Sequence, residues 1–355
     1  MTVLIFISVL LVLIVGHEAG HFAVAKWLKM KVLEFGVGFP PKIFGKKFSP
    51  DGTEYSVNWI PFGGFVRIFG EDAKEATDPV AFPNRPALHQ ALVLFAGPFA
   101  NILLAVLFTT VALMAGALTV VSDENRAYLT EQPKVLIAEV LPGSPAEIAG
   151  LKPGAEIRSS ETPEAFSAFV AQSVGDVSIV AYQNGEEKVF TITPVPGLIS
   201  DEPDRKAIGV STALVAEVSY PPHIALWRAL VDTKNDAVFI LVSFATLIGS
   251  AFTLSADVSQ IAGPVGIASL TGDAVALGFG SLLSFAALLS VNLAIINLFP
   301  FPALDGGRLL FLGIETLFRR KIPLRVASAV NAAGFAILIL LMLAITAQDI
   351  SRLLG

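Results

Sequence analysis

Four apolar stretches, each long enough to cross a lipid bilayer, constrain this chain more than any other feature of its sequence. A transmembrane helix needs about 20 mostly apolar residues, and the stretches cover residues 3–27, 88–121, 275–299 and 326–347. Charged residues make up 15% of the chain, whereas roughly a quarter is usual for a soluble domain. The sequence therefore predicts a polytopic α-helical membrane protein.

Composition also excludes several classes of site. The chain has no cysteine, which removes disulfides, thiolate metal ligands and a cysteine nucleophile. Its net charge is −6, and a nucleic-acid partner would need a clustered basic face instead.

The region between the second and third spans has a different character. Residues from about 122 to 221 are polar enough for a soluble domain. Alternating apolar residues predict strands over 134–140, 177–182 and 188–193, with a hairpin turn at Asn184-Gly185. Ser144 and Thr162 each precede a proline and are typical helix N-caps. We expect a small α+β domain here, which divides the chain into 1–121, 122–221 and 222–355.

A fifth apolar stretch, 237–252, is shorter than the four spans and follows a segment of mixed polarity. Its length and flanks favour an interfacial or re-entrant helix over a full crossing.

Basic residues indicate how the spans are oriented. They gather in the loop after the first span and in the loop between the third and fourth spans, namely Lys26, Lys29, Lys31, Lys42, Lys46, Lys47, Arg308, Arg319, Arg320, Lys321 and Arg325. Both loops are cytoplasmic by the positive-inside rule. The domain over 122–221 and both termini are then expected on the outer face.

Residues 17 to 21 match the pattern H-E-x-x-H within the first span. Positions i and i+4 share one face of a helix, so the imidazoles of His17 and His21 can hold one metal ion, with Glu18 beside the water that the metal activates. The alternative is a polar helix end at the membrane interface. Ionisable groups inside an apolar span are costly and usually functional, which favours the metal site.

A third metal ligand is expected in a hydrolytic zinc site, and Asp305 is a candidate. It follows Asn297 and two prolines at the end of the third span, and two glycines come after it. Such residues interrupt a helix and expose backbone, which membrane proteins tolerate only where it is buried or lines a cavity. A turn or helix-cap role for Asp305 remains the alternative.

Together these motifs resemble the site-2 protease family of intramembrane zinc metalloproteases, and most closely its regulator of sigma-E protease (RseP) type. The resemblance rests on blocks in family order, at 17–21, 62–67, 97–101, 263–267 and 297–307. It implies one Zn²⁺ held by His17, His21 and Asp305, and Glu18 as general base.

The resemblance also implies a substrate-binding region. Asn297 would position the substrate backbone, and a membrane-associated β-hairpin containing Gly63, Gly64 and Phe65 would pair with an extended substrate. A transmembrane helix must unwind before a peptide bond can be cut, and an added strand gives the freed backbone groups partners. For Gly63 and Gly64 an ordinary tight turn is the alternative, and Asn101 is interpreted as structural.

The outer domain resembles a single PDZ domain, through residues 138–146 and 149–154. The following segment, 155–161, departs from the PDZ pattern, so two roles stay open: binding of peptide C-termini, or a gate that excludes substrates with bulky outer domains.

The resulting prediction is an endopeptidase of the bacterial inner membrane, in contact with the lipid bilayer. Its expected substrates are single-span membrane proteins, such as anti-sigma factors or leftover signal peptides, which it would cleave within their transmembrane segments. The alternative is a non-catalytic PDZ scaffold with a vestigial metal site, against which the intact Glu18 argues. A transporter is disfavoured because no inverted repeat is visible in the sequence.

Overall fold

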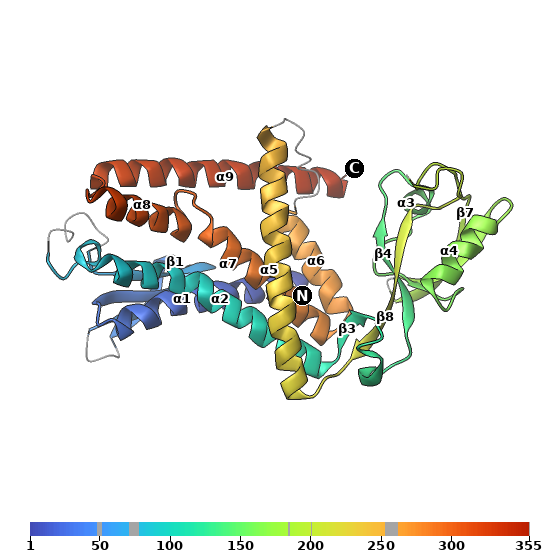
Figure 1. Cartoon of the computed structure of the whole chain (residues 1–355), viewed down its shortest axis with the longest axis horizontal. Helices are drawn as coiled ribbons and strands as arrows, with labels where there is room; N and C mark the ends of the chain where they lie inside the picture. Colours follow the sequence, from blue (N-terminus) through green and yellow to red (C-terminus); the bar gives the residue numbers. More distant parts are fainter. Residues whose placement is uncertain (48–51, 71–77, 184, 200, 253–261, 355) are drawn as a thin grey trace. The chain divides into compact units, whose positions relative to one another are not determined.

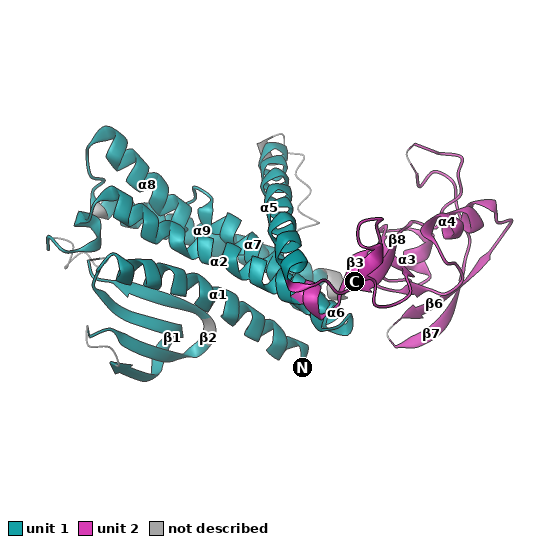
Figure 2. Cartoon of the chain, turned by 60° about the horizontal axis from the view of Figure 1, so that its bottom comes forward, with its two compact units in different colours: residues 1–111, 223–355 teal, residues 112–222 magenta. Residues whose placement is uncertain are grey.

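The computed structural model describes residues 1–47, 52–70, 78–183, 185–199, 201–252 and 262–354. These residues form two compact units, one of Met1–Val111 with His223–Gly355 and the other of Ala112–Pro222 (Figure 2). The order of helices and strands along the chain can be followed in Figure 1.

Four helices in the described residues are long and apolar enough to cross a membrane, which confirms the prediction of a polytopic helical chain. They are α1 (Thr2–Trp27), α2 (Ala87–Ala115), α7 (Phe279–Leu298) and α9 (Leu324–Leu354).

Two of the predicted spans were too long at one end. Helix α2 stops at Ala115, and 117–120 form strand β3 (Ala117–Val120). The third span starts at Phe279, because α6 (Pro264–Ala276) is a separate helix. Each boundary has a glycine with positive φ, Gly116 at 95° and Gly278 at 104°, a conformation that ends a helix.

The fifth apolar stretch belongs to one continuous helix, α5 (Pro222–Phe252). Its apolar half contacts α2 and α7: Ile240 packs in a cluster with Ala105, Ala287 and Val291. The helix is not among the candidate spans. A further helix, α8 (Asp305–Phe318), begins at the proposed third ligand.

The predicted hairpin is a sheet of two long, bent strands, β1 (Val32–Lys47) and β2 (Glu54–Ile68). Phe35 is paired with both Tyr55 and Val66, so the first half of β1 lies between the two halves of β2. The sheet packs on α1 through the ring of Phe22, whose centroid is 5.3 Å from that of Phe35 and 5.9 Å from that of Tyr55. A 3-10 turn, η1 (Phe82–Asn84), shares a buried core with α1, the sheet and α2.

The second unit is a six-stranded sheet in the order β3-β8-β4-β5-β6-β7 with two short helices. Its elements after β3 are η2 (Arg126–Tyr128), β4 (Lys134–Val140), α3 (Pro145–Ile148), β5 (Glu156–Ile157), α4 (Pro163–Gln172), β6 (Val177–Gln183), β7 (Glu186–Ile192) and β8 (Val210–Val218). Ser144 and Thr162 cap α3 and α4 by accepting hydrogen bonds from backbone N–H groups, as predicted. Asn184 of the predicted hairpin turn lies outside the described residues.

Candidate metal centre

Helix α1 places His17 and His21 one turn apart on the face that meets α2. Both side chains are buried, with 7% and 8% of their surface exposed. The close approach of the helices depends on small residues: a Cβ on Gly20 would lie 2.7 Å from the Cβ of Ala100. Small-residue spacing of this kind lets membrane helices pack backbone to backbone.

Asp305 reaches the same point from the far end of the chain, as the first residue of α8. The turn before it is tightly packed. A Cβ on Gly307 would lie 2.7 Å from the carbonyl carbon of Phe301, and the N–H of Ala303 donates to Asn331 Oδ1 at 3.2 Å. These contacts fix the start of α8 and the direction of the Asp305 side chain.

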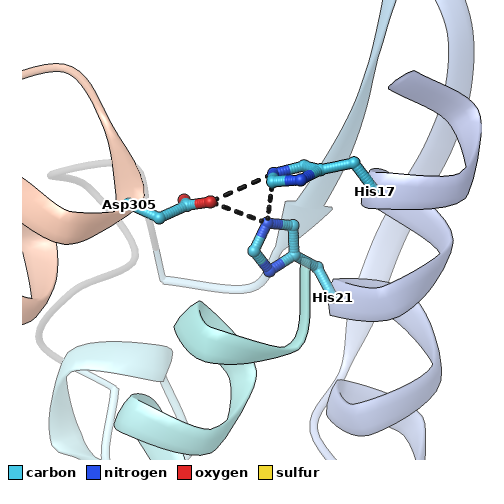
Figure 3. A group of neighbouring side chains, drawn as sticks. All are labelled: His17, His21 and Asp305. Carbon is cyan, nitrogen blue, oxygen red and sulfur yellow. Dashed lines mark hydrogen bonds and ion pairs between the residues drawn. The ribbon is translucent and has the colours of Figure 1, made fainter. Parts of the chain in front are cut away.

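Three donor atoms converge in this place (Figure 3). Asp305 Oδ2 is 3.1 Å from His17 Nε2 and 3.2 Å from His21 Nε2, and the two Nε2 atoms are 3.2 Å apart. Atoms that each lie about 2.0–2.1 Å from a tetrahedral zinc ion are roughly 3.3 Å from one another. The donor set and its spacing therefore fit zinc, with a fourth position left over for a water or a substrate oxygen.

The other nitrogen of His21 is also held. His21 Nδ1 lies 2.7 Å from the carbonyl oxygen of Val93, to which an Nδ1–H donates. This hydrogen bond fixes the tautomer that leaves Nε2 free to bind a metal.

His17 has its corresponding contact with Asn101 of α2. The amide nitrogen of Asn101 is 3.2 Å from His17 Nδ1, and the amide oxygen is buried without a partner among the described residues. Because the two ends of an amide have the same shape, a half-turn of the group would let this oxygen accept the Nδ1–H of a metal-bound His17. Asn101 thus contacts the centre directly, which the structural interpretation from sequence missed.

Gly97 is the second residue that sequence reasoning missed. A Cβ at this position would lie 2.7 Å from His17 Nε2 and would also collide with the ring of His21. No side chain larger than hydrogen fits between α2 and the two imidazoles. The sequence signals were the place of Gly97 in the block 97–101 and its position four residues before Asn101, on the same helix face.

The charge state of Asp305 is set by its neighbours. Burial alone would raise the pKa of its carboxyl, but hydrogen bonds and charge interactions with His17 and His21 outweigh burial and hold the pKa well below its usual value. The carboxylate is therefore ionised and available as a ligand at neutral pH.

A cavity of about 290 Å³ opens beside the three donors. Its lining includes Glu18, Phe65, Asn297 and Arg308 as well as the donors. A Cβ on Gly64 would lie 3.3 Å from Glu18 Cγ, so this part of β2 runs directly beside the glutamate. Gly63 is more distant, with φ of 102° and close contact to the ring of Phe39.

Comparison with known proteins agrees with this geometry. The model of peptidase family M50 matches residues 5–341. One relative, from Clostridium perfringens, is provisionally named a zinc metalloprotease. It is 34% identical to this chain, and the match covers 95% of each chain. A Nostoc protein with the same kind of name is 32% identical over 99% of this chain and 97% of its own, and the zinc metalloprotease RasP of Shouchella clausii is 28% identical over 99% of each. The chain therefore belongs to peptidase family M50, the site-2 protease family, and is a membrane-protein zinc metalloprotease.

Proposed function

We propose that this protein is an endopeptidase of the RseP type that cuts the transmembrane segments of single-span membrane proteins. The observation that carries the proposal is the position of the centre: two buried histidines on a candidate membrane span meet a carboxylate from another helix, beside a cavity that also contains Glu18. A water-accessible cavity inside an otherwise apolar bundle suits hydrolysis of a buried peptide bond.

His17, His21 and Asp305 would hold the metal, which when bound lowers the pKa of a water and polarises the scissile carbonyl. Glu18 would take a proton from the attacking water and deliver it to the leaving amine. Asn297 lines the same cavity and can donate to or accept from a substrate peptide group.

The substrate would be held as an added strand on the second half of β2. Residues 64–68 pair with β1 on one side, and no other strand among the described residues pairs with them. Phe65 and Val66 of this segment line the cavity. An unwound substrate placed here gains backbone hydrogen bonds close to Glu18, whereas substrates that stay helical do not.

Replacing Glu18 by glutamine tests this function. A model single-span substrate is incubated in liposomes with wild type, Glu18→Gln or the control Glu187→Gln, which changes an exposed glutamate of the second unit. We expect Glu18→Gln to keep its zinc and to cut at least about 100-fold more slowly, the usual contribution of a general base. Equal cutting by zinc-loaded wild type and Glu18→Gln would contradict the role of Glu18.

We further propose that the second unit is a single PDZ-like domain that binds peptide. A groove of about 260 Å³ lies between α4 and the start of β8, lined by Phe166, Val170 and Val210 among others. Residues 210–214 pair with β4 on one edge, and β3 joins the other edge only from Val215 onward. The segment that departs from the PDZ pattern forms β5 inside the sheet and does not line this groove.

Binding of a fluorescent peptide with a free C-terminus to the full chain tests the groove. We expect Leu141→Glu, at a groove-lining residue that is 44% exposed, to abolish binding, because it puts a charge against the apolar side chains of the peptide, while the exposed control Val174→Glu retains it. Saturable binding that neither substitution changes would favour the gating role.

A bacterial inner-membrane location, with the second unit and both termini outside and the metal centre toward the cytoplasm, is proposed from the basic loops. The relatives compared are bacterial, and the four apolar helices are long and apolar enough to cross a membrane. Labelling of single cysteines placed at positions 187 and 325 in intact cells tests the orientation: only position 187 is expected to react with an impermeant reagent.

A further inference from the structure

A second polar cavity lies apart from the metal centre, where the start of α2 and the 3-10 turn η1 meet the end of α8. Its volume is about 300 Å³. Four cationic side chains line it, Arg85, Arg319, Arg320 and Lys321, against a single carboxylate, Glu315. Clustered cations that share one cavity repel each other unless an anion joins them.

The hydrogen bonds of these residues leave donors available. Glu315 Oε1 accepts the backbone N–H of Ile322 at 2.8 Å. Arg319 and Arg320 are exposed and make no ion pair or side-chain hydrogen bond within the described parts of the chain. Arg85 donates one Nη2 hydrogen bond to the carbonyl of Lys29 at 2.8 Å, while its buried Nε has no partner among the described residues.

Two hydrogen bonds connect the sides of the cavity. Lys321 Nζ donates to Pro83 O at 2.6 Å and to Asn84 Oδ1 at 2.8 Å, which ties the end of α8 to η1. The positions of the arginines therefore do not depend on a ligand to bring the two elements together.

Exposed apolar residues adjoin the cavity-lining residues Ala87, Thr316 and Arg319 in the sequence. Leu317 and Phe318, in the last turn of α8, are 78% and 68% exposed, and Leu88, at the start of α2, is 69% exposed. Basic groups next to exposed apolar groups are typical of a membrane surface, where cations meet lipid headgroups and apolar side chains enter the acyl region.

From this arrangement we infer that the cavity binds the phosphate of an anionic phospholipid headgroup. Guanidinium groups match phosphate oxygens through paired N–H donors. The occupant is taken as a lipid, and not as free phosphate, because Leu88, Leu317 and Phe318 would contact its acyl chains.

The cavity shares two elements with the metal centre. Phe82 of η1 lines the cavity beside the zinc ligands, and the guanidinium carbon of Arg308 lies 5.6 Å from the centre of its ring. Helix α8 carries Asp305 at one end and the basic residues at the other. A bound headgroup would therefore brace the helix that supplies the third ligand.

Native mass spectrometry of the full chain in detergent tests the inference without measuring proteolysis. Equimolar phosphatidylglycerol and phosphatidylcholine are added to wild type, to Arg319→Gln/Arg320→Gln, and to the control Lys47→Gln/Arg325→Gln, which removes two basic charges outside the cavity. We expect wild type and control to retain phosphatidylglycerol selectively. The arginine pair is expected to lose about 25-fold in affinity, about fivefold for each basic group.

Three results would overturn the inference. The control pair could lose as much affinity as the arginine pair, which would mean that the net surface charge of the protein, and not this cavity, determines phosphatidylglycerol binding. Wild type could bind both lipids equally. Sodium phosphate at millimolar concentration could bind by itself and displace the lipid completely, which would assign the cavity to free phosphate. If the double variant does not fold, Arg320→Gln alone is used, with a loss of about fivefold expected.

Discussion

At the residue scale, the contact between Asn101 and His17 indicates how the first imidazole is oriented. A metal-bound imidazole needs an acceptor for its other N–H, and a half-turn of the Asn101 amide, whose nitrogen lies 3.2 Å from His17 Nδ1, would supply its buried, unpartnered oxygen. Ser290 Oγ donates to the backbone carbonyl of Asn101 at 2.8 Å and connects this residue to α7. The position of Asn101 is therefore supported from a second span.

Replacing Asn101 by leucine is expected to lower zinc affinity about 10–100-fold, the usual effect of losing an outer-shell partner. The loss follows because the Nδ1–H of His17 would be buried without an acceptor. Asn101→Asp keeps an acceptor and should retain more zinc than Asn101→Leu. Competition with a chelator measures the affinity. Asn292→Leu, which changes a half-buried asparagine on α7 whose amide donates to the Leu288 carbonyl of its own helix, is the control, and equal zinc affinity in Asn101→Leu and this control would count against the orienting role.

Gly97 leads to a steric prediction. Gly97→Ala places a methyl group against both imidazoles and is expected to prevent zinc binding, although alanine itself favours a helix by about 1 kcal/mol over glycine. Gly313→Ala makes the same exchange in α8, where nothing lies within 4 Å of the new Cβ, and should keep full zinc content. Zinc is determined on the purified proteins by elemental analysis, and a zinc-replete Gly97→Ala would show that α2 can move away from the centre.

At the scale of elements, the contact between α1 and α2 decides whether the histidines are buried together. Gly16 and Gly20 both face α2, but their neighbours differ in stiffness. A Cβ on Gly16 meets the end of the Leu104 side chain, which can rotate away, whereas a Cβ on Gly20 meets the backbone of Ala96. Backbone atoms inside a helix cannot yield without moving the whole helix.

Gly20→Ala is therefore expected to destabilise the protein by about 1–3 kcal/mol, the usual cost of overpacking, and Gly16→Ala by clearly less. Thermal unfolding in detergent, followed by loss of helical circular dichroism, gives the comparison. The reverse order of stabilities would mean that α1 packs on α2 through other contacts.

At the scale of the whole molecule, the metal would join helices that lie at opposite ends of the sequence. His17 and Asp305 are 288 positions apart, and both belong to the first compact unit. A ligand that binds only the folded state stabilises it by about 2.7 kcal/mol at a free concentration of 100 times its dissociation constant. The second unit contains none of the three donors.

Removing zinc should consequently affect the two units differently. Hydrogen exchange measured with and without a chelator is expected to speed up in α1 and α8, while strands β6 and β7 of the second unit keep their rates. His17→Ala/His21→Ala should exchange fast in α1 and α8 under both conditions. Faster exchange in β6 and β7 after chelation would mean that the metal also stabilises the second unit.

Much of this architecture could be predicted from local patterns. Apolar stretches of spanning length identified the four helices, and caps and alternation located β4, α3 and α4. These features depend on residues a few positions apart, because burial in lipid and capping act within single elements. The exact ends of α2 and α7 were missed, since an apolar sequence alone does not reveal which glycine takes a positive φ.

The sequence by itself determined that the chain enters a membrane and that His17 and His21 share one face of a span. Only the tertiary structure decided what surrounds that face: Asp305 against both rings, Asn101 and Gly97 beside them, and Gly64 next to Glu18. The physical reason is the distance along the chain over which each arrangement is determined. The spacing of the two histidines is fixed by the helix that carries them, whereas each of the other contacts depends on how separate helices and strands pack.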